Sequence, residues 1–291
     1  MLDFIVNPCA GGSNGKKIKR ALSKTEEELK RLKVDYRIHF THKPKHAIDI
    51  AEKIVEAGAT DIAIMGGDGT IHEVINGIPD FDKVNVGIIP CGTGNDFASA
   101  LKLPLDPLEA LKIILNGKTK YVDYMQMPTV RGVNIIGMGI DVEVLKKYEK
   151  ARKKTKFQYT KSLIKTLLKF DYSEFEVALD DAPFEKYRSL IACFANGHRY
   201  GGGIRICPAA DPFDKKLEFV AVKEVKGLKM VNAFIKLKQG KILSVPQVVH
   251  KNFKTVKFKC EKPYTIQVDG QLYDDIPVEI SIVSDKLKIF C

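Results

Sequence analysis

Two hydrophobic patterns alternate along about the first 120 residues of the chain. Short runs rich in aliphatic and aromatic residues predict strands at 2–8, 35–41, 61–65 and 84–90. Segments with an apolar residue at every third or fourth position predict helices at 16–34, 45–58, 71–78, 97–103 and 108–118. Because strand–helix–strand connections make neighbouring strands parallel, these repeats predict a doubly wound α/β domain.

The pattern changes after about residue 121. A hairpin is predicted at 121–139, and two basic helical stretches are predicted at 142–154 and 160–170. Further strands follow one another without intervening helices, at 174–180, 187–196, 216–222, 255–260, 264–270 and 278–283. We therefore expect two domains, an α/β domain at 1–121 and an antiparallel, β-sandwich-like domain at 122–291.

Composition and charge narrow the class of protein. Hydrophobic residues make up 45% and charged residues 29%, which is typical of a water-soluble globular protein. No apolar run approaches the ~20 residues of a membrane span, and the six scattered cysteines suggest reduced thiols in the cytoplasm. The net charge is +11, and residues 146–169 hold ten Lys and Arg but one acid. That segment is either a solvated helical face or a contact with anionic lipid.

Three glycine-rich loops follow predicted strands, at 7–15, 66–70 and 90–96. Glycine lets backbone N–H groups approach an anion, and a following helix N-terminus adds partial positive charge. Three such loops at one sheet edge predict a phosphate-rich ligand, and the alternative for each is a tight strand–helix turn. The first loop lacks the spacing and the hydroxyl of a P-loop, and no GxGxxG fingerprint occurs at a strand end.

One acid, Asp68, lies within the second loop. A carboxylate beside phosphates is repelled unless a cation intervenes or a hydroxyl bonds to it. We expect Asp68 to organise Mg²⁺ or the transferring group. Two neighbours remain open: His72 is either a phosphate contact or an exposed helix residue, and Glu73 either caps its own helix or contacts the ligand.

The segments "NPCAGG", "GGDGTIHEVINGI" and "PCGTGNDFA", with "NGHRYGGGIRICPAADPFD" and "VDGQ" further on, resemble the diacylglycerol kinase catalytic family over nearly the whole chain. This family includes bacterial lipid kinases and sphingosine kinases. The resemblance implies an NAD kinase-like first domain, with ATP bound between the domains. It implies that the nucleotide is bound by Asn7, Pro8, Cys9, Ala10, Gly11, Thr41, Gly66, Gly67, Asp68, Gly69, Thr70, Ile71, His72 and Thr93.

The resemblance also implies a metal site and an acceptor site in the second domain. A structural Mg²⁺ would be held by the Asp214 side chain and by the carbonyls of Asp211 and Lys216, although Lys215 stands where the family usually has glycine. Asp269 and Gln271 would face the acceptor hydroxyl. The family has glutamate in place of Gln271, and a neutral amide cannot accept the proton of that hydroxyl, so either Asp269 does this work alone or the enzyme is slow, selective or inactive.

The resemblance implies an ATP-dependent lipid kinase that transfers the γ-phosphoryl group to a hydroxyl of a diacylglycerol-like lipid. It would be cytoplasmic and peripheral to the inner membrane face. Expected partners are the lipid substrate and an anionic membrane surface, a homodimer is compatible, and nucleic acid is not expected because no recognition motif occurs. Two alternatives stay open: a kinase of a soluble metabolite, and a catalytically impaired binding protein in which Gln271 replaces the family's glutamate.

Overall fold

The computed structural model describes residues 1–12, 15–149, 172–225 and 227–291. The chain forms two compact units, one of Met1–Asp123 with Ser284–Cys291 and one of Tyr124–Val283. It leaves the first unit along β5 (Thr119–Gln126) and returns along β15 (Glu279–Phe290). The last eight residues therefore belong to the first unit, whereas the sequence pattern had assigned them to the second domain.

The first unit contains a parallel sheet with the strand order β2-β1-β3-β4-β15. Its strands are β1 (Leu2–Val6), β2 (Tyr36–Phe40), β3 (Asp61–Gly66), β4 (Asn85–Pro90) and the end of β15. β1, β3 and β4 are buried along almost their whole length, because helices cover both faces of the sheet. The predicted doubly wound α/β unit is confirmed. The contribution of β15 to this sheet was not predicted. The strand predicted at 278–283 continues without a break to Phe290, and its end crosses from the second unit into the first.

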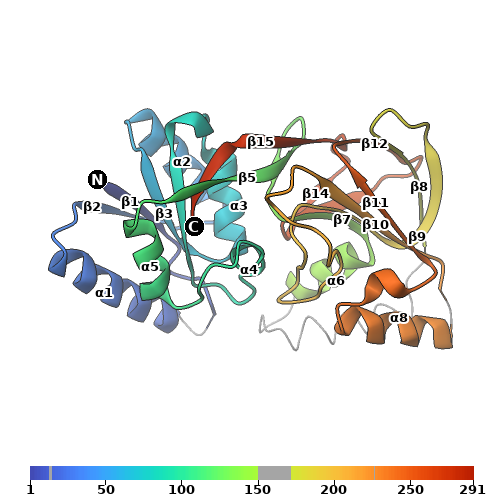
Figure 1. Cartoon of the computed structure of the whole chain (residues 1–291), viewed down its shortest axis with the longest axis horizontal. Helices are drawn as coiled ribbons and strands as arrows, with labels where there is room; N and C mark the ends of the chain where they lie inside the picture. Colours follow the sequence, from blue (N-terminus) through green and yellow to red (C-terminus); the bar gives the residue numbers. More distant parts are fainter. Residues whose placement is uncertain (13–14, 150–171, 226) are drawn as a thin grey trace. The chain divides into compact units, whose positions relative to one another are not determined.

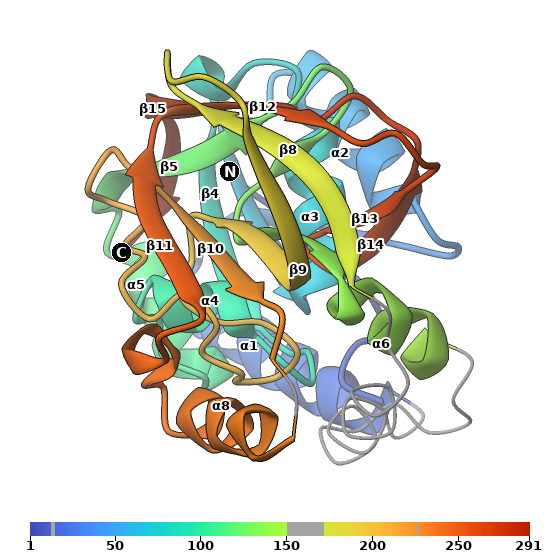
Figure 2. The same ribbon diagram turned by 90° about the vertical axis from the view of Figure 1, so that its right-hand side faces the viewer.

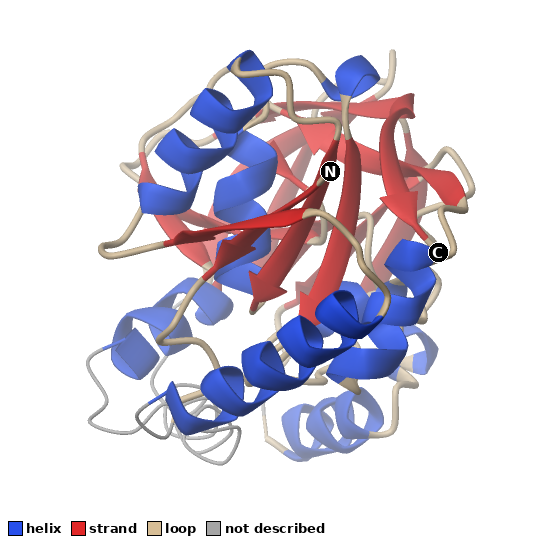
Figure 3. Cartoon of the chain, turned by 90° about the vertical axis from the view of Figure 1, so that its left-hand side faces the viewer, coloured by secondary structure: helices blue, strands red, loops and turns tan. Residues whose placement is uncertain are grey.

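Helices cover this sheet in two pairs (Figures 1 and 3). Helices α1 (Lys16–Arg31) and α5 (Pro107–Leu115) share one apolar cluster with β1, β3 and β4. Helices α2 (His46–Glu56) and α3 (Asp68–Gly77) pack on each other, and a Cβ on Gly77 would lie 2.3 Å from the Ile48 carbonyl oxygen. The short helix α4 (Asp96–Ala100) follows β4. The helices lie on the two faces of the sheet, so the loops that follow the strands lie at its carboxyl edge.

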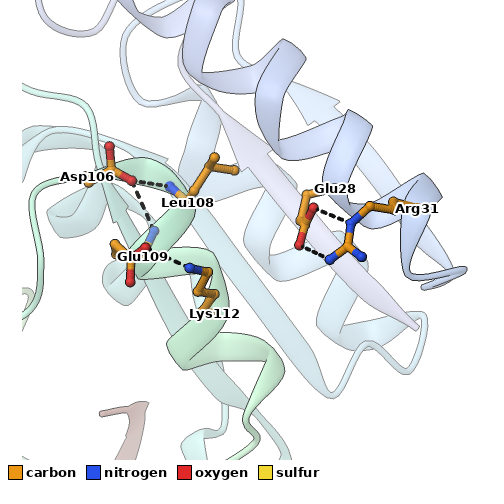
Figure 4. Close-up of polar contacts among 6 residues, drawn as sticks. All are labelled: Glu28, Arg31, Asp106, Leu108, Glu109 and Lys112. Carbon is orange, nitrogen blue, oxygen red and sulfur yellow. Dashed lines mark hydrogen bonds and ion pairs between the residues drawn. The ribbon is translucent and has the colours of Figure 1, made fainter.

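Local polar contacts define the ends of two of these helices (Figure 4). The Asp106 carboxylate accepts hydrogen bonds from the Leu108 and Glu109 amides, at 2.9 and 3.1 Å, and so caps the N-terminus of α5. On exposed surfaces, Glu109 pairs with Lys112 one turn later, and Glu28 pairs with Arg31 on α1. These pairs contribute little to stability because they are exposed to solvent.

The second unit is antiparallel, as predicted, with the strand order β14-β13-β7-β9-β8-β12-β15. Figure 2 shows β8, β9, β10 and β11 of this unit. β10 pairs with β9 and with β11, so β9 pairs with three strands, β7, β8 and β10. Its strands are β6 (Arg131–Gly132), β7 (Ile135–Gly139), β8 (Ser173–Leu179), β9 (Glu185–Ala195), β10 (Leu217–Lys223), β11 (Val248–Phe253), β12 (Thr255–Lys259), β13 (Thr265–Val268) and β14 (Gln271–Asp274).

Several expectations for this unit need correction. β5 and β6 form the start of the predicted 121–139 hairpin, but β7 pairs with β9 and β13 instead. Helix α6 (Ile140–Glu149) matches the first basic stretch as far as residue 149, while the rest of it and the whole of 160–170 lie outside the described residues. The strands β11 and β14 and helix α8 (Leu228–Lys238) were not predicted. Within the described residues, no helix is both long and apolar enough to cross a membrane.

Candidate functional site

The three glycine-rich loops of the first unit lie against one another at the carboxyl edge of its sheet. The Asn7 amide donates to the Met65 carbonyl at 3.1 Å, and the Cys91 amide donates to the Gly66 carbonyl at 2.7 Å. A Cβ on Gly11 would lie 2.5 Å from the Cys91 carbonyl oxygen. Residues from all three loops therefore meet, as the sheet topology requires.

Two glycines permit the closest approach in this group. A Cβ on Gly92 would lie 2.5 Å from the Cα of Gly67, and a Cβ on Gly67 would lie 2.9 Å from the Cα of Gly92. The two backbones therefore pack directly on each other, which only glycine allows. The side chain of Asn95 secures this contact, because its Oδ1 accepts a 2.8 Å hydrogen bond from the Gly92 amide.

Polar side chains of the predicted nucleotide set also join the loops. The Asn7 amide group donates to the Thr70 hydroxyl at 3.0 Å, and Asn7 Oδ1 accepts from the Cys9 amide at the same distance. Thr70 is buried and packs over Gly66, where a Cβ would lie 2.6 Å from the Thr70 hydroxyl oxygen. Asn7 and Thr70 thus fix the shape of the loops that a phosphate would meet.

Asp68 joins the second loop to the third. Its Oδ1 accepts a 3.1 Å hydrogen bond from the Phe97 amide at the start of α4, and Asp68 itself lies in the first turn of α3. A carboxylate at helix N-termini is stabilised by the N–H groups that point at it. The expected role of Asp68 towards metal or phosphate stays a prediction, and the structure adds a scaffold role.

Exposure divides the predicted nucleotide residues into two groups. Cys9, Gly69 and Thr93 are exposed, and Asn7, Pro8, Gly11, Gly67 and Asp68 are half-buried. The others are buried beneath them, namely Ala10, Thr41, Gly66, Thr70, Ile71 and His72. A bound ligand would therefore contact the first group directly and be supported by the second.

The sequence left two possible roles for each of His72 and Glu73, and the structure excludes one role for each residue. The His72 side chain is 1% exposed and lies beside Asn76, so it is not an exposed helix residue. The Glu73 carboxylate accepts hydrogen bonds from the Lys45 amide at 3.0 Å and from the Ala47 amide at 3.3 Å. Glu73 therefore caps α2 and not its own helix, because α2 and α3 pack side by side.

In the second unit, the predicted metal residues form one tight turn before β10. Asp214 Oδ1 accepts from the Lys216 amide at 3.0 Å, and the Asp211 carbonyl accepts from the Asp214 amide at 3.4 Å. Lys215 has a φ of 59°, the left-handed conformation that glycine adopts most easily. The backbone therefore keeps this shape without glycine.

The chemistry of this turn fits Mg²⁺, because a carboxylate and peptide carbonyls are the hard oxygen donors that the ion prefers. Within the described residues, no group of three or more His, Cys, Asp and Glu side chains gathers as a metal site. A metal here would therefore depend on one side chain and on the backbone.

Asp269 lies at the turn between β13 and β14, with a φ of 51°. Its carboxylate accepts three backbone hydrogen bonds, from Val133 and Asn134 at 2.8 Å and from Ile135 at 3.1 Å. The Asp269 amide donates back to the Ile135 carbonyl at 3.0 Å. Asp269 therefore anchors the segment before β7, and its expected role at the acceptor hydroxyl stays a prediction.

A buried polar cluster next to this turn was missed by sequence reasoning. The side-chain oxygen Oε1 of Gln267 accepts a hydrogen bond from the Gly270 amide at 2.8 Å. A Cβ on Gly137 would lie 1.9 Å from Asp141 Oδ2 and 2.7 Å from Gln267 Nε2, so both side chains occupy the space above Gly137. A glycine inside the strand "IIGMG" was the signal, because such a glycine often marks a close approach.

Asp141 is the unusual member of this cluster. It is 2% exposed, and neither carboxyl oxygen has a hydrogen-bond partner of normal geometry among the described residues. Burial raises the pKa of Asp141 to about 7, and the Val142 amide and the Gln267 side chain oppose this only in part. Asp141 is therefore largely protonated when the surrounding pH is below neutral.

The second unit also contains a cavity of about 750 Å³ between α6 and the strands β8, β12 and β13. Aromatic side chains of Phe175, Phe258 and Tyr264 line it. Its charged lining includes Lys146 and Arg188, which pair with Glu143 and Glu174, and the cation Lys262. Such a mixture suits a ligand with an apolar body and an anionic or polar head.

Comparisons with known proteins agree with this architecture. The family described as "Diacylglycerol kinase catalytic domain" matches residues 2–127, and the family described as "YegS C-terminal NAD kinase beta sandwich-like domain" matches residues 134–291. A protein of Mycobacterium tuberculosis (strain ATCC 25618 / H37Rv) named "Diacylglycerol kinase" is 27% identical over 255 residues, which is 85% of this chain and 81% of that protein.

Two solved structures share the fold. A structure titled as a diacylglycerol kinase from Bacillus anthracis str. Sterne is 23% identical, covers 99% of this chain and 96% of its own, and has a TM-score of 0.80. Yeast NADH kinase complexed with NADH is 10% identical, covers 100% of this chain and 82% of its own, and has a TM-score of 0.53. The predicted likeness to NAD kinases is confirmed at the level of the fold. With two family matches that together span almost its whole length, the chain belongs to the diacylglycerol kinase catalytic family.

Proposed function

We propose that this protein is an ATP-dependent lipid kinase that transfers the γ-phosphoryl group of ATP to a hydroxyl of a diacylglycerol-like lipid. The observation that carries the proposal is the direct packing of Gly67 on Gly92, which holds two glycine loops together at the carboxyl edge of a parallel sheet. Backbone amides and helix N-termini at such an edge are suited to bind phosphates. Membership of the family supports the same reaction.

In this proposal the exposed members of the loops contact the nucleotide. The backbones near Cys9, Gly69 and Thr93 bind the phosphates, and Asn7 and Thr70 hold the loops in shape. Asp68 lies in the second of these loops, so it would repel bound phosphates unless a cation were present. The Asp214 carboxylate and the carbonyls of Asp211 and Lys216 would hold the structural Mg²⁺, whose charge would stabilise the fold around their turn.

The acceptor lipid would be bound by the second unit. The cavity lined by Phe175, Phe258 and Tyr264 supports this assignment, because aromatic walls fit acyl chains and the charged side chains of the lining fit a polar head. Gln271 would face the acceptor hydroxyl. Phosphoryl transfer depends mainly on positioning and on charge stabilisation, so activity persists at a lower rate without a carboxylate base at that position.

We further propose that the enzyme acts in the cytoplasm at the inner face of the membrane. The excess of cations at 146–169 supports an electrostatic contact with anionic lipid. Of that segment, the structure describes the backbone to residue 149, and the side chains of Lys146 and Lys147 lie on α6 at the rim of the cavity.

A second candidate function has its own observation. Asp269 is occupied by three backbone amides, and Gln271 cannot take a proton. A protein with this acceptor site could bind nucleotide and lipid without turnover. It would regulate or sequester its ligands instead of converting them.

Turnover of γ-labelled ATP separates these functions. Purified protein is incubated with labelled ATP, Mg²⁺ and a panel of hydroxyl lipids in mixed micelles, and with NAD as the soluble alternative. The proposal expects label in an organic-phase lipid phosphate. Label in NADP would instead identify a kinase of a soluble metabolite, and tight ATP binding without any labelled product would identify the binding protein.

A further inference from the structure

Helix α8 presents two different faces. Ala233 is buried, and Met230, Phe234 and Leu237 pack on the same apolar cluster, which includes Val220 and Val222 of β10. These four positions recur at the spacing of one helical face. α8 is thereby fixed to the sheet of the second unit, and its opposite face points away from that sheet (Figure 2).

The outward face of α8 carries two exposed aliphatic side chains. Val231 is 55% exposed and Ile235, one turn later, is 48% exposed. Among the residues that the structure describes, seven large hydrophobic side chains are exposed, and these two are the only pair that shares one helix or strand. Exposed aliphatic residues that gather in this way mark a contact surface more often than single ones do.

Lysines flank this aliphatic pair on both sides. At about 100° per residue, Lys229 and Lys236 project on one side of Val231 and Ile235, and Lys238 projects on the other. No acidic residue occurs on α8. Moreover, residues 225–260 contain nine lysines and no Asp or Glu, so their excess of positive charge equals that of 146–169. The partner of this surface must therefore be negatively charged as well as apolar.

We propose that Val231, Ile235 and the flanking lysines of α8 form a docking surface for an anionic lipid bilayer, with α8 lying in the plane of the interface. The proposal rests on the proposed lipid kinase function, because a membrane-embedded substrate requires the enzyme to reach the bilayer. Aliphatic side chains enter the acyl boundary while lysines contact lipid phosphates, which is the arrangement of interfacial helices. A second copy of the chain fits poorly, because two surfaces of the same sign repel each other.

Vesicle sedimentation tests this surface directly. The probes are phosphatidylcholine vesicles with and without phosphatidylglycerol, and the full chain is used throughout. We expect Val231→Asn with Ile235→Asn to reduce binding to the anionic vesicles by about ten-fold or more, since roughly half of each side chain loses its burial in lipid. Replacing Lys229, Lys236 and Lys238 by Gln should cost up to about five-fold for each lysine, and added salt should shrink this difference.

Matched controls come from the first unit. Leu32 and Leu105 are 44% and 56% exposed, so Leu32→Asn with Leu105→Asn removes similar aliphatic area elsewhere. Lys19, Lys24 and Lys53 are exposed lysines for a matched charge variant. Both control variants should bind anionic vesicles like wild type. Equal losses in the α8 variants and the controls would overturn the assignment to α8.

A water-soluble, short-chain diacylglycerol separates this surface from the proposed function. The α8 variants should phosphorylate it with the kcat/KM of wild type while losing activity on the same lipid in vesicles. If wild type fails to phosphorylate the short-chain lipid but its vesicle binding still depends on α8, the docking surface stands and the proposed reaction fails. If the α8 variants change the mass in analytical ultracentrifugation and leave vesicle binding intact, α8 is a dimer contact and the proposal is overturned.

Discussion

The glycine-loop edge of the first unit and the Asp269 turn of the second unit use an aspartate in different ways. At the glycine loops, Asp68 is half-exposed and bridges to the Phe97 amide at the start of α4. At the turn, the carboxylate of Asp269 receives three backbone amides from one segment. Asp68 therefore joins two loops at the carboxyl edge of a parallel sheet, whereas Asp269 is a structural anchor of one segment.

Two buried acids show the same contrast. Burial opposes ionisation of Asp3, but hydrogen bonds from Arg37 and His39 outweigh it, so the pKa of Asp3 is lowered. Among the described residues no cation contributes to the pKa of Asp141, and burial raises that pKa to about 7. In the first unit Asp3 is therefore paired with cations, whereas in the second unit Asp141 is neutral over much of the physiological range.

Removing the anchor should give the largest effect. Asp269→Ala leaves three backbone donors without their acceptor, and we expect a loss of about 3 to 5 kcal/mol of unfolding free energy. Asp68→Ala removes a partly exposed cap and should cost about 1 kcal/mol. Urea denaturation of both variants measures the difference. Equal destabilisation would show that the two aspartates have the same structural role.

Replacing Asp141, the buried acid of the second unit, by a neutral residue should change how the stability of the protein depends on pH. Because the folded pKa of Asp141 lies above its ordinary value of 3.8, its contribution is fully present at low pH and is lost as pH rises towards about 7. Asp141→Asn should therefore gain stability over wild type at pH 8, by at most about 4 kcal/mol, and lose that advantage near pH 4.

Thermal melts of both proteins across this pH range give the measurement. Asp3→Asn is the control, in melts extended below pH 4, because a depressed pKa predicts the opposite sign: wild type should lose the contribution of Asp3 as pH falls below the ordinary value of 3.8. A pH-independent difference between wild type and Asp141→Asn would contradict the uncompensated burial of Asp141.

Backbone packing at the glycine loops should give an intermediate effect. Gly92→Ala pushes a Cβ to 2.5 Å from the Cα of Gly67, which should cost about 1 to 3 kcal/mol. Gly69→Ala has open space around its Cβ and lies within α3, so we expect a gain of up to about 1 kcal/mol. Comparable stabilities in urea would show that the loops do not depend on the Gly67–Gly92 contact.

Restoring the family's acid should have the smallest effect in free energy. Gln271→Glu supplies a proton acceptor beside the Asp269 turn, and we expect about a ten-fold rise in kcat, at the low end of general base effects. ATP affinity should stay unchanged. Steady-state phosphorylation of the best lipid measures both quantities, and an unaltered kcat would remove position 271 from the acceptor site.

Sequence alone predicted the first region well and the second only in part. Glycines at the ends of apolar strands are local signals, and the parallel topology then brings their loops together at one edge. The contacts of Asp269 with residues 133–135 and the space shared by Gly137, Asp141 and Gln267 join segments more than a hundred residues apart. No local pattern reports such contacts.

Two further differences between the sequence prediction and the structure, at α8 and at Glu73, have similar physical causes. Helix α8 was not recognised because its outward face carries Val231 and Ile235, which blur the usual amphipathic period. Glu73 was expected at its own helix or at the ligand, but it caps α2 because the packing of α2 on α3 brings their ends together. Tertiary contacts decided both cases.

The most direct test of the nucleotide site is the melting temperature of the wild type with and without millimolar ATP and Mg²⁺, beside that of Gly69→Ala. A ligand that binds only the native state stabilises it, by about 2.7 kcal/mol at a hundred times its Kd. We predict a clear rise for the wild type. A smaller rise is expected for Gly69→Ala, because the added methyl group hinders phosphates from approaching an exposed backbone. If millimolar ATP leaves the melting temperature of the wild type unchanged, this result would contradict the assignment of the glycine loops to nucleotide binding.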